Sequence, residues 1–278
     1  MSDAKTETTS IPLKEIQTRA FNVLCLLVDF LESEQIPYYL IGGTLLGAVR
    51  HQGFIPWDDD IDIGIPRKNY DQLISHLAHL PHTLKAVHPS IDMLTPYPFL
   101  IISDPATTLV IDYATPYNRG VGVDVFPLDN FPQSKLLQAL LWKGIFIFRS
   151  ISMNKQGGYY KKKLDPPLSI YFKFLSLINK FIPRSFIFKG YDIFLSSSRK
   201  SASLIGNLYG MYGKKEIVDS DIFGKPSQVK FESRFFRAPS QPEEYLTAIY
   251  GDFKKFPPQE KRNSGHKIKK FNINIKKS

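Results

Sequence analysis

Four aspartates, Asp58, Asp59, Asp60 and Asp62, fall within five positions of the chain. No other feature of the sequence constrains the fold as much. Ile61 and Ile63 alternate with the last of them, which predicts a strand over residues 59–65. On a strand, Asp60 and Asp62 point to one face while the isoleucines enter the core. Such close carboxylates repel each other unless a cation lies between them. The segment therefore predicts a sheet that holds a hard divalent ion, Mg²⁺ or Mn²⁺.

Two glycines lie upstream of these acids, in the segment YYLIGGTLLGAVRH. Residues 38–42 predict a short buried strand, which Gly42 and Gly43 end, and Thr44 to His51 can form a short helix. Backbone N–H groups and the helix dipole suit a phosphate at such a helix start. We therefore expect Gly42, Gly43 and Thr44 to face a substrate phosphate.

A further aspartate, Asp124, lies on a second predicted strand over residues 121–126, with a valine on either side. An acid in such surroundings is costly to bury alone. Beside the strand of Asp60 and Asp62, it would complete the metal site. The glycine turn, the Asp-x-Asp strand and the third acid together indicate metal-assisted chemistry on a phosphate ester.

Three other interpretations compete for the acidic segment. A solvated acidic turn does not account for the alternating isoleucines. An EF-hand calcium loop starting at Asp58 needs Gly at its sixth position and Glu at its twelfth, where this chain has Ile63 and Asn69. A purely structural ion site stays open, although the preceding glycine turn favours a phosphate substrate.

Cationic and aromatic residues between the glycine turn and the acids are further candidates. Arg50 could neutralise a diphosphate or lie on the helix surface, and the need to offset charge during phosphoryl transfer favours the first. His51 is a candidate contact of the donor. Trp57 could help to cage a quaternary ammonium through cation–π contacts. Its candidate partners, for which a core position is the simpler interpretation, are Tyr38, Tyr39 and Tyr97.

Three histidines, His76, His79 and His82, have a spacing that resembles a metal cluster. A proline ends the predicted helix before the last of them, and no neighbouring cysteine or acid joins them. We interpret them as an exposed helix face rather than a zinc site. Arg67, at the start of the same helix, is expected to be solvated.

Periodicity and charge divide the chain. The expected helices cover residues 12–36, 66–80, 136–151 and 168–182, and the remaining expected strands cover 99–103 and 108–113. Residues 1–132 carry 8 Lys+Arg and 16 Asp+Glu, whereas residues 133–278 carry 28 and 10. The basic part suits phosphates, nucleic acid or an anionic membrane. Nucleic acid is not expected as a partner, because no recognisable motif contains these basic residues.

The two apolar segments of the basic part contain cationic residues, so they are either core helices or a surface that rests on an anionic membrane. Between them lie Lys161, Lys162 and Lys163. The single cysteine, Cys25, cannot form an intrachain disulfide, and the first residues lack the apolar core of a secretory signal. We therefore expect a cytoplasmic protein, either free or peripheral at the inner membrane face.

The segment GGTLLGAVRHQGFIPWDDDIDIGIPR, followed by VDVFPLD, resembles the LicD family of the nucleotidyltransferase-fold superfamily, which includes fukutin-type transferases. The resemblance covers residues 36–132 and returns in FESRFFRAP, YLTAIYGDF and PPQEKR near the C-terminus. Ser233 stands where the family pattern has Gly. The resemblance implies an α/β (α+β) nucleotidyltransferase-like mixed sheet. Its expected parts are a disordered 1–10, a catalytic core 11–132, a helical and basic C-terminal part 133–262 that completes the site, and a basic tail 263–278.

The family transfers a phospho-alcohol, typically phosphocholine from CDP-choline, to a sugar hydroxyl of a surface glycan such as lipopolysaccharide, which can be lipid-linked. By resemblance, Asp60 and Asp62 are metal ligands, and Asp124 is a third ligand or the base. Asp58 and Arg50 are further catalytic candidates. Two alternatives stay open. One is a nucleotidyltransferase that acts on a small molecule or protein, and the other is a non-catalytic, basic membrane-binding module.

Overall fold

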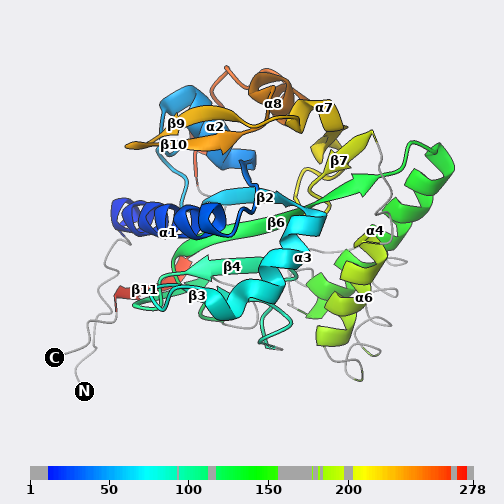
Figure 1. The fold of residues 1–278 in the computed structure, drawn as a ribbon, viewed down its shortest axis with the longest axis horizontal. Coiled ribbons are helices and arrows are strands. Elements are labelled where there is room, and N and C mark those ends of the chain that lie inside the picture. Colours follow the sequence, from blue (N-terminus) through cyan, green and yellow to red (C-terminus); the bar gives the residue numbers. More distant parts are fainter. Residues whose placement is uncertain are drawn as a thin grey trace.

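The computed structural model describes residues 12–92, 94–111, 117–155, 177, 181, 184–196, 203–263 and 268–273 of the 278-residue chain. Figure 1 shows a central sheet with helices packed around it. Helices and a sheet of mixed strand direction confirm the predicted α/β class. The expectations for residues 1–10, for residues 161–163 and for nearly all of the apolar segment 168–182 lie outside the described residues.

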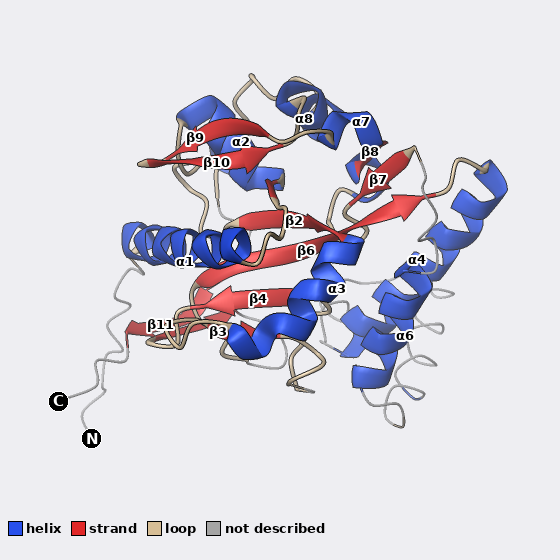
Figure 2. Cartoon of the chain, in the orientation of Figure 1, coloured by secondary structure: helices blue, strands red, loops and turns tan. Residues whose placement is uncertain are grey.

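The first helix, α1 (Leu13–Ser33), forms where the apolar period predicts it. Its core-facing side chains, three or four positions apart, are fully buried: Ile16, Ala20, Leu24, Leu27 and Leu31. The helix ends before Pro37, as expected, because the residue before a proline is driven out of the helical region. Figure 2 shows α1 and α3 (Arg67–His76) in front of the central strands.

The central sheet has the strand order β1–β2–β6–β4–β3 among the described residues. These strands are β1 (Tyr39–Leu40), β2 (Asp62–Pro66), β3 (Lys85–Val87), β4 (Leu100–Ser103) and β6 (Gly122–Phe131). β2 and β6 run parallel, whereas the other neighbours are antiparallel. A parallel pair needs a long crossover, and α3, η1 (Leu77–His79), β3 and β4 all lie between these two strands in the chain. The isoleucines and valines of β2 and β6 fill the core, as predicted.

The C-terminal part contributes strands that the sequence patterns did not indicate. β7 (Leu204–Gly206) pairs with the end of β6, and β8 (Ile217–Asp219) pairs with β7. A separate hairpin joins β9 (Ser227–Phe231) to β10 (Arg234–Ala238). β11 (Ile268–Ile273), within the expected basic tail, pairs with β5 (Thr107–Ile111). The helices of this part are α4 (Lys135–Lys155), α6 (Arg184–Ser196), η2 (Gly213–Glu216), α7 (Ser220–Phe223), α8 (Pro242–Tyr250) and η3 (Gln259–Lys261). No helix in the described ranges is both long and apolar enough to cross a membrane.

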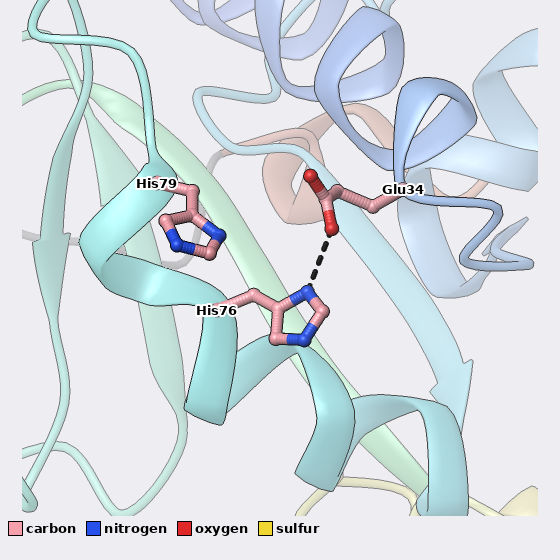
Figure 3. Close-up of side chains that lie close together, drawn as sticks. All are labelled: Glu34, His76 and His79. Atoms are coloured by element: carbon pink, nitrogen blue, oxygen red, sulfur yellow. Dashed lines mark hydrogen bonds and ion pairs between the residues drawn. The ribbon is translucent and has the colours of Figure 1, made fainter.

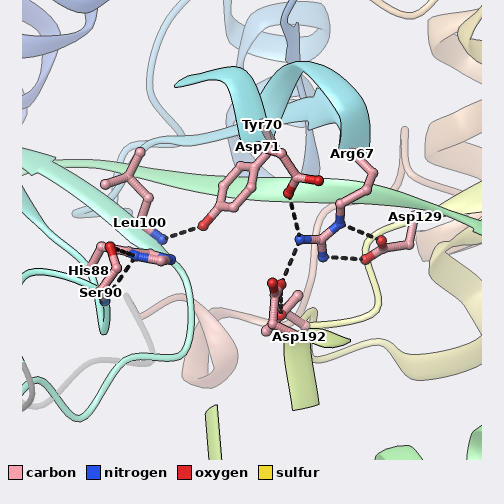
Figure 4. Close-up of polar contacts among 9 residues, drawn as sticks. Arg67, Tyr70, Asp71, His88, Ser90, Leu100, Asp129 and Asp192 are labelled. Carbon is pink, nitrogen blue, oxygen red and sulfur yellow. Dashed lines mark hydrogen bonds and ion pairs between the residues drawn. The ribbon is translucent and has the colours of Figure 1, made fainter. Parts of the chain in front are cut away.

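Arg67 lies in a buried ionic network and is not solvated, so the expectation for it is wrong (Figure 4). Its Nε and Nη2 atoms donate to the two carboxylate oxygens of Asp129 over 2.6 and 2.9 Å. Its Nη1 atom donates to Asp192 Oδ1 over 2.6 Å, and the Tyr209 hydroxyl donates to the same oxygen over 3.1 Å. The network joins α3, β6 and α6, and so ties the C-terminal helices to the sheet.

Candidate active site

The two predicted acidic strands lie side by side. Asp62 on β2 and Asp124 on β6 are partners in the register of this parallel pair. The Asp124 N–H donates to the carbonyl oxygen of Ile61 over 2.8 Å. The prediction that the third acid lies beside the Asp-x-Asp segment is therefore confirmed.

The strand itself is shorter than predicted, because β2 begins at Asp62 and not at residue 59. Its neighbour β1 has only two residues, which pair with Ile63 and Gly64, so the ladder on that side does not extend to Asp60. Strand alternation therefore does not position Asp60. Asp60 lies in the loop before β2, where its ligand oxygen and those of Asp58 and Asp59 lie within 4.8 Å of one another.

Like charges and burial act together on Asp62. Burial raises the pKa of Asp62 well above its ordinary value, and the neighbouring carboxylates of Asp60, Asp124, Asp58 and Glu216 raise it further. Glu216, on η2, is itself buried, and its Oε1 accepts a hydrogen bond from the Tyr212 N–H over 2.9 Å. The sequence analysis missed Glu216, since nothing near it in the chain suggests a site. An oxygen-only set of this kind suits a hard cation such as Mg²⁺.

The glycine turn begins α2 (Gly42–His51) and approaches the acids closely. Gly42 has a φ of +55°, and a Cβ there would lie 3.1 Å from Asp62 Oδ2. A Cβ on Gly43 would lie 2.9 Å from Asp58 Oδ2. The Asp62 N–H donates to the Thr44 hydroxyl over 2.8 Å, so this buried threonine fixes the start of β2. Glycine is needed here because a larger side chain would crowd the acids.

Arg119 is a second residue that the sequence analysis missed. Its guanidinium forms an ion pair with the Asp124 carboxylate and lies over the ring of Tyr97, 5.2 Å from the ring centroid. Both members of the ion pair are buried. Arg119 lies in the turn before β6, five residues before Asp124. This closeness in the sequence is the signal that could have identified Arg119 as a site residue. The ion pair offsets part of the charge at this edge of the site.

Arg50, His51 and Trp57 belong to a second group, at the other end of α2. Arg50 lies about 10 Å along the helix axis from Gly43, whereas Trp57 follows the helix and directly precedes Asp58. The guanidinium of Arg50 lies over the ring of Phe256, 4.6 Å from its centroid. The guanidinium of Arg262 lies 5.6 Å from the ring centroid of Trp57 and 5.5 Å from that of Phe256. We call these five residues the cation–aromatic cluster.

Arg50 is held by the protein's own groups. Its Nη1 atom donates to the Phe253 carbonyl oxygen and its Nε atom donates to His51 Nε2, each over 3.0 Å. Burial and the charge of Arg262 lower the pKa of Arg50. Burial and the charge of Arg50 likewise lower the pKa of His51, which favours a neutral imidazole at pH 7. The cluster therefore places the guanidinium groups of Arg50 and Arg262 at the Phe256 ring, and that of Arg262 also at Trp57, the residue before Asp58.

The tyrosines considered as partners of Trp57 do not gather around it. Tyr38 is buried beneath the guanidinium of Arg237. The Tyr39 hydroxyl donates to the Gly224 carbonyl oxygen over 2.9 Å. Tyr97 belongs to a separate apolar cluster and contacts Arg119. These three residues are core and positioning residues, which was the simpler interpretation.

Glu232 positions the loop between α2 and the acids. It lies in the β9–β10 turn with a φ of +53°. Its N–H donates to the Gln52 carbonyl oxygen over 2.8 Å, and its Oε1 accepts from the Phe54 N–H over 3.2 Å. A Cβ on Gly53 would lie 2.4 Å from the same carboxylate, which explains the glycine there. Ser233, the departure from the family pattern, leaves this contact intact.

Two of the three histidines considered for a metal cluster meet an acid from another helix (Figure 3). His76 Nδ1 lies 2.7 Å from Glu34 Oε2, beyond the end of α1, and His79 completes a group whose ligand atoms lie within 4.8 Å of one another. His82 is not part of this group. The expectation that no acid joins the histidines is wrong, because Glu34 is distant in the chain. The group is partly exposed and lies apart from Asp62.

A family model described as the LicD/FKTN/FKRP nucleotidyltransferase domain matches residues 35–138. Over 259 residues, the chain is 27% identical to the lipopolysaccharide cholinephosphotransferase LicD of Haemophilus influenzae, covering 92% of this chain and 96% of that protein. A segment of 39 residues is 54% identical to the ribitol 5-phosphate transferase FKRP of human and mouse, covering 14% of this chain and 8% of FKRP. The family match includes Gly42, Asp62 and Asp124, and the similarity to LicD continues beyond this matched domain along nearly all of both chains.

Proposed function

We propose that this protein transfers a phospho-alcohol, phosphocholine from CDP-choline, to a sugar hydroxyl of a surface glycan such as lipopolysaccharide. The similarity along nearly the whole length of a cholinephosphotransferase supports this donor and acceptor. The observation that carries the proposal is the register of β2 and β6, which sets Asp62 beside Asp124 next to the glycine turn. A nucleotide-activated donor also supports a cytoplasmic location.

The acids fit a divalent cation, because their donor atoms are all oxygens and because like charges raise the pKa of buried Asp62. Asp60, Asp62 and Asp124 would hold Mg²⁺ or Mn²⁺, with Asp58 close to Asp60. The ion, when bound, would supply positive charge that offsets the negative charge of the donor's diphosphate.

The chain's own residues would then bind the donor and receive a proton. The start of α2 at Gly43 would hold a phosphate oxygen, since helix N-termini favour anions. The guanidinium groups of Arg50 and Arg262 would attract the donor's negative charge. The sugar oxygen forms a new bond to the phosphorus of the phosphocholine group, the bond to CMP breaks, and the hydroxyl proton passes to a carboxylate. Asp124 and Asp58 are the candidate bases.

The test is product analysis with purified protein, CDP-choline, a glycan acceptor and Mg²⁺. We expect free CMP and a phosphocholine-modified glycan in equal amounts. No product should form with EDTA or with the Asp62→Asn variant, whereas Asp252→Asn, at an exposed position, should behave as the parent. Release of pyrophosphate from a nucleoside triphosphate would instead support a nucleotidyltransferase. Equal turnover with EDTA would contradict the metal assignment.

Donor choice needs a separate measurement. A ligand that binds only the folded protein raises its melting temperature, and at equal concentration the ligand with the higher affinity raises it more. We expect CDP-choline with Mg²⁺ to raise the melting temperature more than other CDP-alcohols at equal concentration. A larger shift with another CDP-alcohol would replace choline in the proposal and leave the reaction type unchanged.

A further inference from the structure

The α4–α6 pair forms a surface that the proposed reaction does not use. A Cβ on Gly144 would meet the Phe194 ring, and Phe148 contacts the Tyr191 ring at a centroid distance of 5.3 Å. Moving along α4 from Gly144 to Phe148, the contact on α6 moves back from Phe194 to Tyr191. The two helices therefore pack antiparallel. Figure 1 shows them together at one side of the sheet.

Each helix has a buried side and an exposed side. On α4, Ile145 is buried, whereas Leu136 is 70% exposed and Leu140 and Ile147 are also exposed. Lys143 lies in the same exposed stripe, because positions 136, 140, 143 and 147 follow the helical period. This stripe on the outer side of α4 thus consists of three large apolar side chains and one lysine.

The outer side of α6 repeats this pattern. Phe186 is 70% exposed and Ile193 is also exposed, with the exposed Lys189 between them in the same stripe. Tyr191 and Leu195, on the opposite side, are buried. Since the two helices pack side by side and both turn their buried residues to the core, their exposed stripes form one outer face.

Among the side chains that the structure describes, those in the two exposed stripes carry only positive charge. The sequence of α4 contains four basic residues and no acid: Lys135, Lys143, Arg149 and Lys155. In α6 the one acid is Asp192, which forms the ion pair with Arg67. An apolar stripe with interspersed lysines and without a free acid is the pattern of a helix that lies in the headgroup region of an anionic bilayer.

We infer that the outer face of the α4–α6 pair docks on an anionic lipid bilayer, with the apolar side chains in the interface and Lys143 and Lys189 at the phosphates. A second copy of this chain fits less well, because two such faces would bring lysines against lysines. Docking would hold the protein where a lipid-linked glycan is presented, but the inference does not depend on the proposed reaction.

The experiment is co-sedimentation of the full chain with vesicles of phosphatidylcholine alone or mixed with phosphatidylglycerol, at low and moderate salt. We expect binding to the anionic vesicles that weakens with salt. The double variant Leu140→Glu/Ile147→Glu and the double variant Lys143→Glu/Lys189→Glu should each bind at least about tenfold more weakly. Their melting temperatures should match that of the parent, because all four side chains are exposed.

Matched controls place the same changes on other exposed surfaces. Leu94→Glu, at a position that is also exposed, and Lys230→Glu, on β9, should bind vesicles as the parent does. The inference is overturned if the parent shows no preference for anionic vesicles at low salt, or if the α4–α6 variants bind as the controls do. A stable dimer in solution that Leu140→Glu/Ile147→Glu dissociates would assign the face to a second copy and would also overturn it.

Discussion

The parallel strands β2 and β6 support a charged cluster at each end, and the two clusters differ in how far their carboxylates are balanced by guanidinium groups. At the start of the strands, Asp62 lies beside Asp124, and every charged group that shifts the pKa of Asp62 is acidic. At the other end, Asp129 accepts two hydrogen bonds from Arg67. Burial raises the pKa of Asp129 as well, but the adjacent guanidinium counteracts it.

We interpret this difference as the mark of a structural cluster at one end and of the proposed metal site at the other. A buried carboxylate with a bidentate arginine is balanced within the protein, and its role is to join α3, β6 and α6. An excess of carboxylates at one place costs stability in the metal-free protein. Such an arrangement is useful when a cation from outside completes it. In the proposed function, one end of this pair of strands therefore joins elements of the fold and the other end binds a cation.

The largest expected effect is loss of turnover in Asp62→Asn. The change removes a charge from the centre of the acid-rich cluster and keeps the shape of the side chain. We expect no measurable CMP release with Mg²⁺ and a melting temperature in EDTA at or above that of the parent, because a costly buried charge is gone. Calorimetry and the CMP assay measure the two effects. Near-parental turnover would show that Asp62 is not part of the metal site.

Asp124→Asn should have the next largest effect. Loss of a general base lowers the rate by roughly 10²–10⁴-fold, and loss of a ligand lowers it at least as much. The variant also removes the buried ion pair between Asp124 and Arg119, so its melting temperature should fall while that of Asp62→Asn does not. Single-turnover kinetics and calorimetry distinguish the variants. A rate within a few-fold of the parent would make Asp124 a structural acid.

The balanced cluster should respond in the opposite way. Asp129→Asn leaves Arg67 buried with less compensating charge, which typically costs about 3–5 kcal/mol of unfolding free energy. Asp71→Asn is the matched control, since Asp71 lies 3.5 Å from the same guanidinium but its side chain is 38% exposed, against 1% for that of Asp129. Chemical denaturation should show a large loss for the first variant and a loss below about 1 kcal/mol for the second. Equal losses would contradict the distinction between the two ends of the strands.

Local patterns predicted the elements that are long or strictly alternating. The apolar period of α1 and the buried strands β2 and β6 were visible in the sequence, and so was the placement of Asp62 near Asp124. β7 and β8 have three residues each, which is too short for alternation to be recognised. These strands form because the end of β6 offers a partner, and that is tertiary information.

The errors in the site have a common physical origin. Arg67 looked solvated because its partners, Asp129 and Asp192, are far along the chain. Glu34 escaped notice beside His76 for the same reason, as did Glu216 beside Asp62. Asp60 was assigned to a strand because alternation alone cannot show that β1 is too short to pair with it. Charge partners that are distant in sequence were the information that the patterns lacked.

The smallest expected effect is a pH dependence that differs between the two clusters. The pKa of Asp62 is raised in the folded, metal-free protein, so the folded state holds a proton that the unfolded state has released. Stability therefore falls as pH rises from about 4 towards the raised pKa, by at most about 1.4 kcal/mol per pH unit. Asp62→Asn lacks this loss, so its stability advantage over the parent in EDTA should grow with pH.

Denaturation of both proteins in EDTA at several values between pH 4.5 and 8 measures this advantage, and the difference between them cancels the titration of groups that do not interact with Asp62. Asp71→Asn is again the control, and its difference from the parent should stay constant over the same range. Mg²⁺ should stabilise the parent increasingly as pH rises, because it binds the ionised carboxylates, and should have no such effect on Asp62→Asn. A difference between Asp62→Asn and the parent that does not change with pH would mean that the acids around Asp62 do not act on it as the geometry implies.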